Sequence, residues 1–302
     1  MKIYKNANLN KKYHKGVIAI GNFDGIHLGH QKVINEARKK AKSKKLPFGI
    51  ITFEPVPVMY FNSKIKNHRI NSLEQKKIQL KKLKLDFLII IKFNKIFSSL
   101  TAEKFIKEII YNKTKCSFLY VSKNFKFGYK RKGNIQTLKK YEKLYNFKSL
   151  ITKPYKKNKK IISSTLIRKK IALGKIMEAN KLLNREWRIE GKVIKGKKRG
   201  RKIGFPTCNL KLYDYVIPLL GVYAVKINGL KFSKKGIANV GFRPTFNGSN
   251  LLLETNIFGI NKNLYNKEIS VSFRKFIRRE KKFKNLEHLK KQIKIDIKKA
   301  KK

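Results

Sequence analysis

The chain has few of the residues that stabilise secreted or metal-bound domains. It contains two cysteines in 302 residues, Cys116 and Cys208, and neither has the spacing of a metal site. We therefore expect no disulfide framework and no zinc cluster, and the isolated thiols fit a reducing cytosol. Residues 87–91 are typical of its longest apolar runs, and no apolar segment of a secretory signal follows the first residues. The sequence predicts a cytoplasmic protein without membrane contacts.

Acidic residues are scarce as well. The chain has 17 Asp and Glu against 76 Lys and Arg, which gives a formal net charge of +59 at pH 7. Such an excess is typical of nucleic-acid-binding proteins. Here the lysines are spread over nearly every predicted element, as an AT-rich coding bias would place them. We expect no specific nucleic-acid partner, and only weak RNA contacts that disappear as salt rises.

The apolar content is sufficient for packed cores, at 41% hydrophobic and 11% aromatic residues. In the first half, short apolar runs alternate with segments of helical periodicity. This alternation predicts an α/β fold with a doubly wound, Rossmann-like parallel sheet, which binds ligands at the carboxyl ends of its strands. One of the helices begins after Ser72, with Ile78 and Leu80 expected to face inward. The predicted strands are 17–20, 47–53, 86–93, 117–122 and 147–151.

Past Asn184 the pattern changes to short strands that end in one amphipathic helix at residues 286–297. The pair Asn228-Gly229 favours a tight hairpin turn. Several short strands with one helix predict a small antiparallel β-barrel with a terminal helix. We therefore predict two domains, residues 1–184 and 185–302. The strands of the second are predicted at 187–195, 222–227, 237–240, 251–258 and 269–273.

Two histidines stand at a predicted strand–turn–helix junction near the N-terminus. The strand 17–20 is followed by G-N-F-D-G at residues 21–25, then H-L-G-H, and helical spacing starts near Leu28. A helix N-terminus offers unpaired N–H groups to phosphate. His27 and His30, three residues apart, can project from one face of the first turn and donate hydrogen bonds to a polyphosphate. Two surface histidines would be the plain alternative, which the strand and the glycine turn disfavour.

This stretch resembles the HxGH signature of nucleotidylyltransferases, in the form found in the prokaryotic bifunctional riboflavin kinase/FAD synthetase family. The resemblance extends over essentially the whole chain. It implies that the first domain transfers AMP from ATP to FMN, giving FAD and pyrophosphate, and that the second phosphorylates riboflavin to FMN. It makes His27 and His30 catalytic. It also implies that the nucleotide binds at Gly21, Asn22, Phe23, Asp24 and Gly25.

Two further motifs of the first domain match the family. N-F-K-F-G, residues 124–128, follows the fourth predicted strand and matches a N/D-F-x-F-G segment, although core packing would also explain its aromatic rings. I-S-S-T-L-I-R, residues 162–168, matches I-S-S-T-x-I-R, whose hydroxyls and arginine make a phosphate clamp; a plain N-cap role for Ser164 can coexist with it. The resemblance assigns Asn124, Phe125, Phe127 and Gly128 to flavin, and Ser163, Ser164, Thr165 and Arg168 to the nucleotide.

The second domain opens with a basic, glycine-rich segment, residues 195–205. It lacks the G-K-S/T of a Walker A loop. The simpler interpretation is a nucleic-acid-binding loop or a lysine-rich turn. The segment also resembles the riboflavin kinase loop that closes over ATP, here with Gly196, Gly200 and Gly204. The family's P-T-A-N signature follows as P-T-C-N, in which Thr207 and Asn209 are hard oxygen donors suited to Mg²⁺.

Two segments complete the kinase resemblance. Residues 239–246, N-V-G-F-R-P-T-F, match N-I-G-x-R-P-T-F and assign Arg243 to flavin. Residues 253–258, L-E-T-N-I-F, match the catalytic E-x-H-x-x-F region, with Asn256 in place of histidine. Glu254 stands in an apolar strand, where a carboxylate is costly unless it is paired or functional. The resemblance implies that it is the general base; an ion pair with a nearby lysine or arginine is the alternative.

One departure concerns F-E-P-V-P, residues 53–57, where the family has F-E-P-H-P. Val56 cannot donate a hydrogen bond to phosphate, which leaves open a riboflavin kinase with impaired adenylyl transfer. A basic nucleic-acid-binding protein on a degenerate enzyme scaffold is the other alternative. For the bifunctional enzyme we expect Mg²⁺ as cofactor and ATP, riboflavin and FMN as substrates. The sequence carries no signal for oligomeric state.

Overall fold

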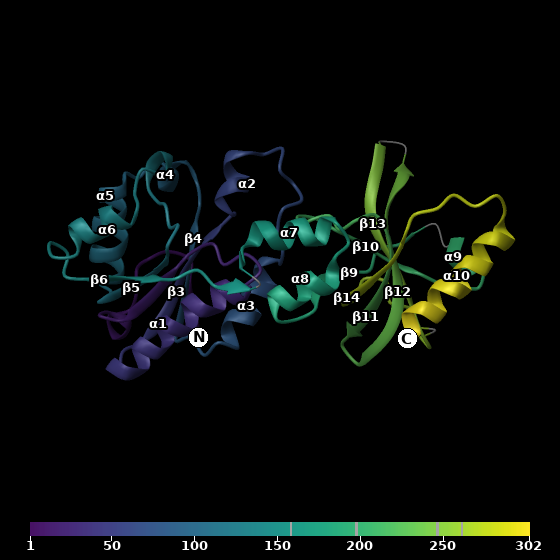
Figure 1. Cartoon of the computed structure of the whole chain (residues 1–302), viewed down its shortest axis with the longest axis horizontal. Coiled ribbons are helices and arrows are strands. Elements are labelled where there is room, and N and C mark those ends of the chain that lie inside the picture. Colours follow the sequence, from purple (N-terminus) through teal and green to yellow (C-terminus); the bar gives the residue numbers. More distant parts are fainter. Residues whose placement is uncertain (158, 197–198, 246–247, 261) are drawn as a thin grey trace. The chain divides into compact units, whose positions relative to one another are not determined.

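The computed structural model describes residues 1–157, 159–196, 199–245, 248–260 and 262–302 (Figure 1). The chain folds into two compact units, and the first comprises Met1–Ile65 with Leu73–Ser163. The second comprises Lys66–Ser72 with Ser164–Lys302. Helices α7 (Ser164–Ala172) and α8 (Ile176–Leu183) belong to this second unit, because α8 packs on its strands. The division into domains at residue 184 stays a prediction.

The first unit is built on a six-stranded sheet in the order β1-β4-β3-β2-β5-β6, and every pair in it is parallel. This confirms the predicted doubly wound α/β fold. The sheet separates two clusters of buried apolar side chains, one on each face. Its strands are β1 (Lys2–Tyr4), β2 (Val17–Ile20), β3 (Phe48–Glu54), β4 (Phe87–Lys92), β5 (Phe118–Ser122) and β6 (Lys148–Thr152).

Strand order makes the carboxyl ends of β2 and β5 the expected ligand-binding edge of the sheet. From β2 the chain moves outward through β3 and β4, and then returns to add β5 on the other side of β2. Ligands of such sheets bind at the carboxyl ends of the strands where the direction of winding reverses. Both the G-N-F-D-G turn after β2 and the segment 124–128 after β5 lie at that edge.

The helices of this unit are α1 (Leu28–Lys44), α2 (Pro57–Phe61), α3 (Leu73–Lys81), α4 (Lys95–Ser98), α5 (Ala102–Phe105), which runs into a π-helical segment (Ile106–Thr114), and α6 (Ile135–Tyr141).

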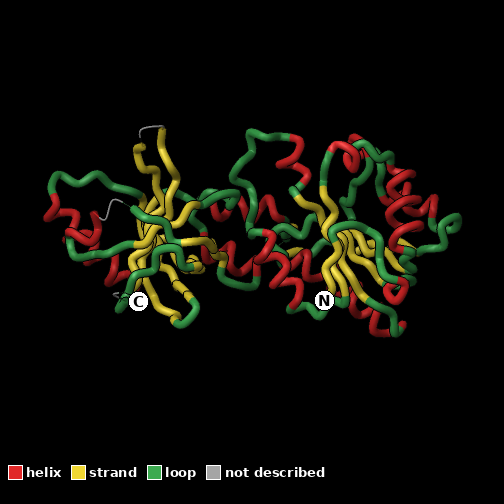
Figure 2. The backbone as a smooth tube through the Cα atoms, turned by 180° about the vertical axis from the view of Figure 1, so that it is seen from behind, coloured by secondary structure: helices red, strands yellow, loops and turns green. Residues whose placement is uncertain are grey.

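The second unit contains the predicted antiparallel barrel. Its six strands follow the order β10-β13-β12-β11-β14-β9, and a bridge in which Ile194 N donates to Asn209 O at 2.9 Å brings the two ends of the sheet together (Figure 2). A short helix, α9 (Arg199–Lys202), precedes β10. The strands are β9 (Trp187–Lys192), β10 (Cys208–Lys211), β11 (Gly221–Gly229), β12 (Phe232–Thr245), β13 (Gly248–Ile257) and β14 (Glu268–Arg279).

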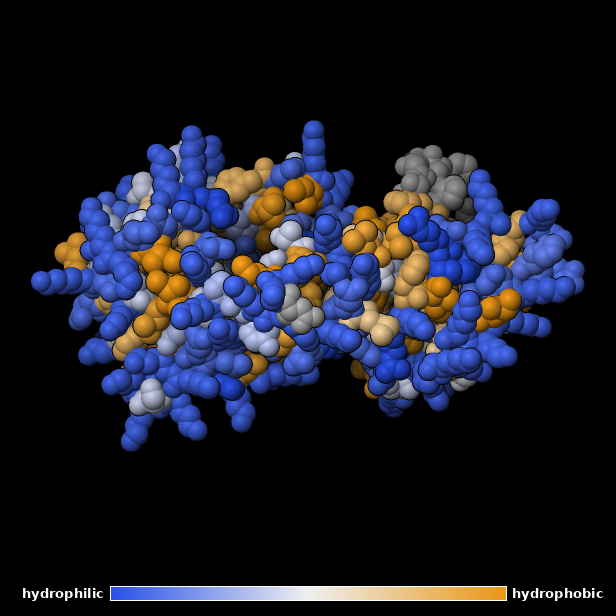
Figure 3. Space-filling model, viewed as in Figure 1, coloured by the Kyte–Doolittle hydropathy of each residue, from blue (hydrophilic) through white to orange (hydrophobic). Residues whose placement is uncertain are grey.

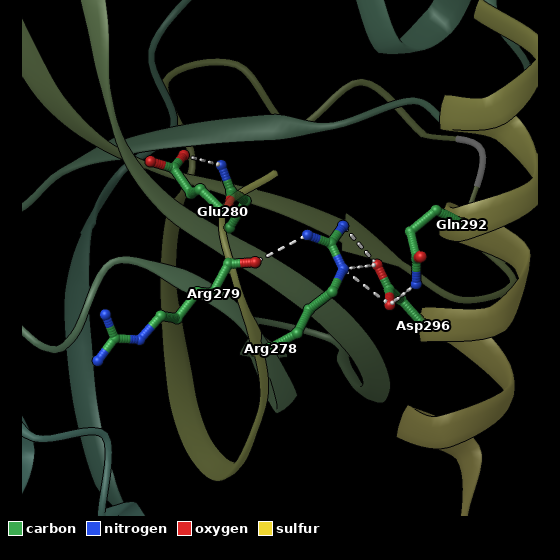
Figure 4. A network of polar contacts seen from close by, with 6 residues as sticks. Arg278, Arg279, Glu280, Gln292 and Asp296 are labelled. Atoms are coloured by element: carbon green, nitrogen blue, oxygen red, sulfur yellow. Dashed lines mark hydrogen bonds and ion pairs between the residues drawn. The ribbon is translucent and has the colours of Figure 1, made fainter. Parts of the chain in front are cut away.

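The terminal helix α10 (Leu286–Lys301) is held to the barrel by a buried ion pair. Arg278, at the end of β14, reaches Asp296 with Nη2 at 2.8 Å and with Nε at 2.9 Å, and Gln292 donates to the same carboxylate at 2.9 Å (Figure 4). The Asp296 side chain is 1% exposed. Since breaking a buried pair leaves an uncompensated charge, this contact fixes the helix against β14.

Residues 66–72 pack within the second unit although the elements before and after them belong to the first. Arg69 forms an ion pair with Asp214 at 3.2 Å, and Val216 N donates to Arg69 O at 2.8 Å. The indole of Trp187 donates to Ile70 O at 2.7 Å, which satisfies the N–H of a side chain that is 1% exposed. No pattern in the sequence predicts this segment.

Two local predictions are wrong. The β11–β12 hairpin turns at Leu230 and Lys231, because Gly229 pairs with Phe232 and the predicted turn residue Asn228 pairs with Ser233. In α3, Leu80 is buried as predicted, whereas Ile78 is 47% exposed. Two residues apart on a helix, these side chains point in different directions.

Candidate active sites

The first candidate site is the turn of residues 21–25, called the phosphate turn below. Phe23 and Ile26 have φ of +46° and +39°, and Gly25 has +83°. The left-handed region costs a side-chain-bearing residue roughly 1–2 kcal/mol. The Asn22 carbonyl accepts hydrogen bonds from Thr52 Oγ1 at 3.1 Å and from Lys76 Nζ at 2.9 Å. Buried contacts therefore hold the turn in this shape.

The two histidines lie together at the start of α1. His27 is the N-cap, and its Nδ1 accepts from His30 N at 3.3 Å. Because Nδ1 is the acceptor in this hydrogen bond, Nε2 is the ring nitrogen that can donate a proton to a phosphate oxygen. The His30 ring stacks on His27, with centroids 3.7 Å apart and 20° between the planes, and meets the edge of Phe23 at 5.3 Å. This arrangement can present N–H donors beside the helix N-terminus.

Gly29 explains how the serine motif reaches this helix start. A Cβ on Gly29 would lie 3.1 Å from the His27 ring and 3.1 Å from Ile162 O. Only glycine therefore admits the Ile162 backbone at this distance, and Ser163 follows directly. Ser164, Thr165 and Arg168 begin α7 of the second unit, where Ser164 and Arg168 are half-buried and Thr165 is exposed.

The segment 124–128 is anchored from one side. Phe127 is buried in the core, exchanges backbone hydrogen bonds with Gly133 and packs against Phe105 at 5.2 Å. Phe125 stacks on Phe127, with centroids 5.3 Å apart, and is half-buried. Asn124 is exposed. Gly128 has φ +70°, and its Cβ would lie 2.6 Å from Ala102 N. Phe127 thus acts through packing. Phe125 packs partly against the same core, and Asn124 is exposed after β5.

Val56 stands at the N-cap of α2 and is 3% exposed. Its side chain makes no capping hydrogen bond. The valine is accommodated as a buried apolar residue. Compared with the histidine of the family motif, it removes a hydrogen-bond donor without disturbing the packing.

The second candidate site is a row of polar side chains across three strands of the barrel. Glu254 on β13 pairs in register with Asn209 on β10 and Asn239 on β12, so the three lie on one face of the sheet. Glu254 is half-buried within its otherwise apolar strand. Asn209 is 7% exposed, and its Oδ1 has no hydrogen-bond partner among the described residues. A buried amide oxygen of this kind fits a hard cation such as Mg²⁺.

The glycine-rich loop approaches this row closely. A Cβ on Gly196 would lie 2.0 Å from Asn209 Nδ2, and one on Gly200 would lie 3.3 Å from Thr207 Oγ1. Gly196 is therefore where the loop backbone touches the proposed metal ligand. Gly204 follows α9 with φ +88°. Residues 197 and 198 of the loop, and the side chain of Arg243, lie outside the described part.

Asn256, which replaces the family's histidine, supports the same segment. Its Nδ2 donates to Pro206 O at 2.7 Å, next to Thr207. Thr207 also lines a surface cavity next to β13. Thr255 of β13 lines the same cavity, and its buried Oγ1 has no hydrogen-bond partner among the described residues. The lining is mixed: apolar side chains make up part of it, and Arg201 and Lys262 add two cationic groups that could receive a polyphosphate. It includes Arg201, Thr207, Thr255, Lys262, Asn263 and Tyr265.

Asn239 adds a link to a second carboxylate, since its Nδ2 donates to Glu280 Oε1 at 3.1 Å. Glu280 directly follows β14, whose Arg278 holds α10 (Figure 4). The sequence motif marked Asn239 through N-V-G-F-R-P-T-F, but only the fold brings Glu280 to it.

Both cysteines are expected to resist alkylation. They are free and buried, and burial raises the pKa of the Cys116 and Cys208 thiols to about 12. At pH 8 such a thiol is ionised in roughly one molecule in 10⁴, and the thiolate is the reactive form. Iodoacetamide treatment followed by mass spectrometry should find the native protein unmodified and the urea-unfolded protein doubly modified. Rapid labelling of the native protein would contradict this.

Comparison with known proteins matches both halves of the chain. Residues 9–166 match the family FAD synthetase, and residues 183–302 match the family riboflavin kinase. A crystal structure described as a macrolide-efflux protein from Streptococcus pneumoniae superimposes with a TM-score of 0.87 at 30% identity, over 99% of this chain and 98% of that one. No helix in the described part of this chain is both long and apolar enough to cross a membrane.

Curated relatives extend over nearly the full length. The bifunctional riboflavin kinase/FMN adenylyltransferase of Buchnera aphidicola subsp. Schizaphis graminum is 43% identical over 98% of this chain and 96% of its own. The enzyme of the same name from Haemophilus influenzae is 40% identical over 97% of this chain and 96% of its own. With both family matches in order along the chain, the protein belongs to the bifunctional riboflavin kinase/FMN adenylyltransferase family, which makes FMN and then FAD.

Proposed function

We propose that the phosphate turn, His27 and His30 carry the adenylyl transfer. A phosphate oxygen of FMN attacks the α-phosphorus of ATP, the bond to the β-phosphate oxygen breaks, and pyrophosphate leaves. No covalent enzyme intermediate is needed, because orientation and stabilisation of the developing charge suffice. The α1 N-terminus and the imidazole N–H groups supply that charge stabilisation. The family motifs also assign Ser163, Ser164, Thr165 and Arg168 to the nucleotide, and Asn124 with Phe125 to the flavin, with Phe127 in support.

We further propose that Glu254 is the general base of the kinase reaction. It accepts the proton of the riboflavin 5′-hydroxyl as that oxygen attacks the γ-phosphorus of ATP and ADP leaves. Thr207 and Asn209 would hold Mg²⁺, which when bound neutralises charge on the ATP phosphates. The observation that carries this assignment is the buried Oδ1 of Asn209, in the same strand-to-strand row as Glu254, which has no hydrogen-bond partner within the part of the chain that the structure describes. Gly196 and Gly200 let the loop close on these ligands, and Arg243 is proposed to contact the flavin.

One incubation tests the whole assignment. Purified protein with riboflavin, ATP and Mg²⁺ should yield FMN first and FAD second, separated by chromatography. Supplying FMN in place of riboflavin, again with ATP and Mg²⁺, tests the second half-reaction. It therefore separates the bifunctional enzyme from a riboflavin kinase whose adenylyl transfer is impaired by Val56. If riboflavin is converted to FMN but neither riboflavin nor FMN yields FAD, the result supports the kinase with impaired adenylyl transfer.

The basic surface is proposed to make only weak, sequence-blind RNA contacts. Hydrophilic side chains cover the visible face without gathering in one region (Figure 3), in keeping with a charge of +59 spread along the chain. Fluorescence titration with two unrelated RNA oligonucleotides should give similar affinities that fall steeply as salt increases, because counterions are released. Salt-resistant, sequence-selective binding without flavin turnover would instead support the nucleic-acid-binding alternative. We place the enzyme in the cytoplasm, in keeping with free thiols and ATP as substrate.

A further inference from the structure

Lys76 occupies a core position that an apolar residue would be expected to fill. In α3 it is 1% exposed, whereas Ile78 of the same helix is 47% exposed. An ammonium group is costly to remove from water unless it is hydrogen-bonded. Hydrophilic side chains cover the visible face (Figure 3), and Lys76 is the one lysine among the buried charged residues of the described part, so its burial is not a consequence of composition.

Its ammonium group contacts the phosphate turn. Lys76 Nζ donates to Asn22 O at 2.9 Å and lies 3.4 Å from Thr52 Oγ1. Thr52, on β3 next to β2, is itself fully buried and donates to the same carbonyl at 3.1 Å. Two donors from two different elements therefore fix one carbonyl oxygen of the turn.

The turn needs this support because of its backbone conformation. Phe23 and Ile26 both have positive φ, at +46° and +39°, a region that residues with side chains rarely adopt. The same backbone leads directly into His27, which caps α1 and stacks on His30. A misplacement of about 1 Å in such a site is enough to lower a rate by roughly 10²-fold.

The geometry points to Lys76 as a positioning residue for adenylyl transfer. By holding the Asn22 carbonyl, it keeps the turn and both histidines in the arrangement that receives the triphosphate of ATP. It acts through the turn and not on the reacting atoms. The inference rests on the proposed roles of His27 and His30.

The test uses the full chain with Lys76→Met, which keeps the length of the side chain and removes its donors. We expect kcat/KM for ATP in FAD formation to fall by about 10–100-fold, with a rise in KM as well as a loss in kcat. A change that only lowered the folded fraction would reduce the apparent kcat and leave KM for ATP unchanged. Lys81→Met, an exposed position on the same helix, is the matched control and should behave as wild type.

Thr52→Val removes the second donor on the same carbonyl and introduces no charge change. It should raise KM for ATP and lower kcat, as Lys76→Met does, but by a smaller factor. This variant tests the inference even if Lys76→Met does not fold. Wild-type kinetics for Thr52→Val, or an unchanged KM in folded Lys76→Met, would overturn the inference. His30→Ala in the same assay distinguishes failure of this inference from failure of the proposed function. If His30→Ala forms FAD at wild-type rate, the proposed adenylyl-transfer site is wrong, and not only the role of Lys76.

Discussion

A His30→Ala protein is expected to form FMN from riboflavin at nearly wild-type rate and to lose FAD formation from FMN. His30 stacks on His27 at the start of α1, beside the phosphate turn, and all three belong to the first compact unit. Removing one donor to a developing anionic charge typically costs about 10²–10³-fold in kcat. The alanine also removes the ring that packs on His27, so the remaining imidazole is less well oriented. The rate of each half-reaction, measured separately by chromatography of FMN and FAD, tests this.

His288→Ala is the matched control, since His288 is exposed on α10 and has no proposed role. Both activities should survive that change. Parallel loss of FMN and FAD formation in a folded His30→Ala protein would show that the two reactions are not divided between the two units as proposed.

The α/β order of the first unit could be predicted because its strands are strongly apolar and its helices periodic. β2 and β3 were predicted to within a residue, since each is an uninterrupted buried run. β1 is not predicted because it is three residues long and mostly exposed, and β10 is not predicted because Asn209 and Lys211 interrupt its apolar residues. The hairpin turn was misplaced because the pairing of β11 with both its neighbours, β12 and β14, outweighs the local preference of Asn-Gly for a turn.

The candidate sites were predictable as far as their motifs are local. The approach of His27 to His30, and the placement of residues 124–128 at the same edge of the sheet, follow from short segments on predicted strand ends. The role of Lys76, and the contact that Asn256 makes, could not be found this way. Each side chain acts through one backbone carbonyl that is distant in sequence, Asn22 O for Lys76 and Pro206 O for Asn256. Such contacts leave no periodicity, and a lysine in a helix otherwise predicts an exposed position.

Glu254→Gln is expected to reduce riboflavin phosphorylation by about 10²–10⁴-fold, because general-base assistance is typically worth that factor. This corresponds to roughly 3–5 kcal/mol of activation barrier. Glutamine keeps the shape of the side chain and most of its hydrogen-bonding capacity, so riboflavin binding should be retained. FAD formation from supplied FMN should be unchanged, since the phosphate turn lies in the other unit. Initial rates of both half-reactions and a riboflavin binding titration measure these effects.

The competing explanation for Glu254 is an ion pair that only stabilises the barrel. It predicts a lower melting temperature and parallel losses in binding and rate, whereas a base predicts a loss in kcat with stability and binding retained. Glu268→Gln, an exposed carboxylate at the start of β14, provides the matched control. The row Asn209–Glu254–Asn239 favours the catalytic role, because two amides on neighbouring strands flank the carboxylate. On the same face the Asn209 Oδ1 has no partner among the residues that the structure describes. A stable Glu254→Gln protein with wild-type kinase activity would remove Glu254 from the mechanism and leave the kinase site resting on Thr207 and Asn209.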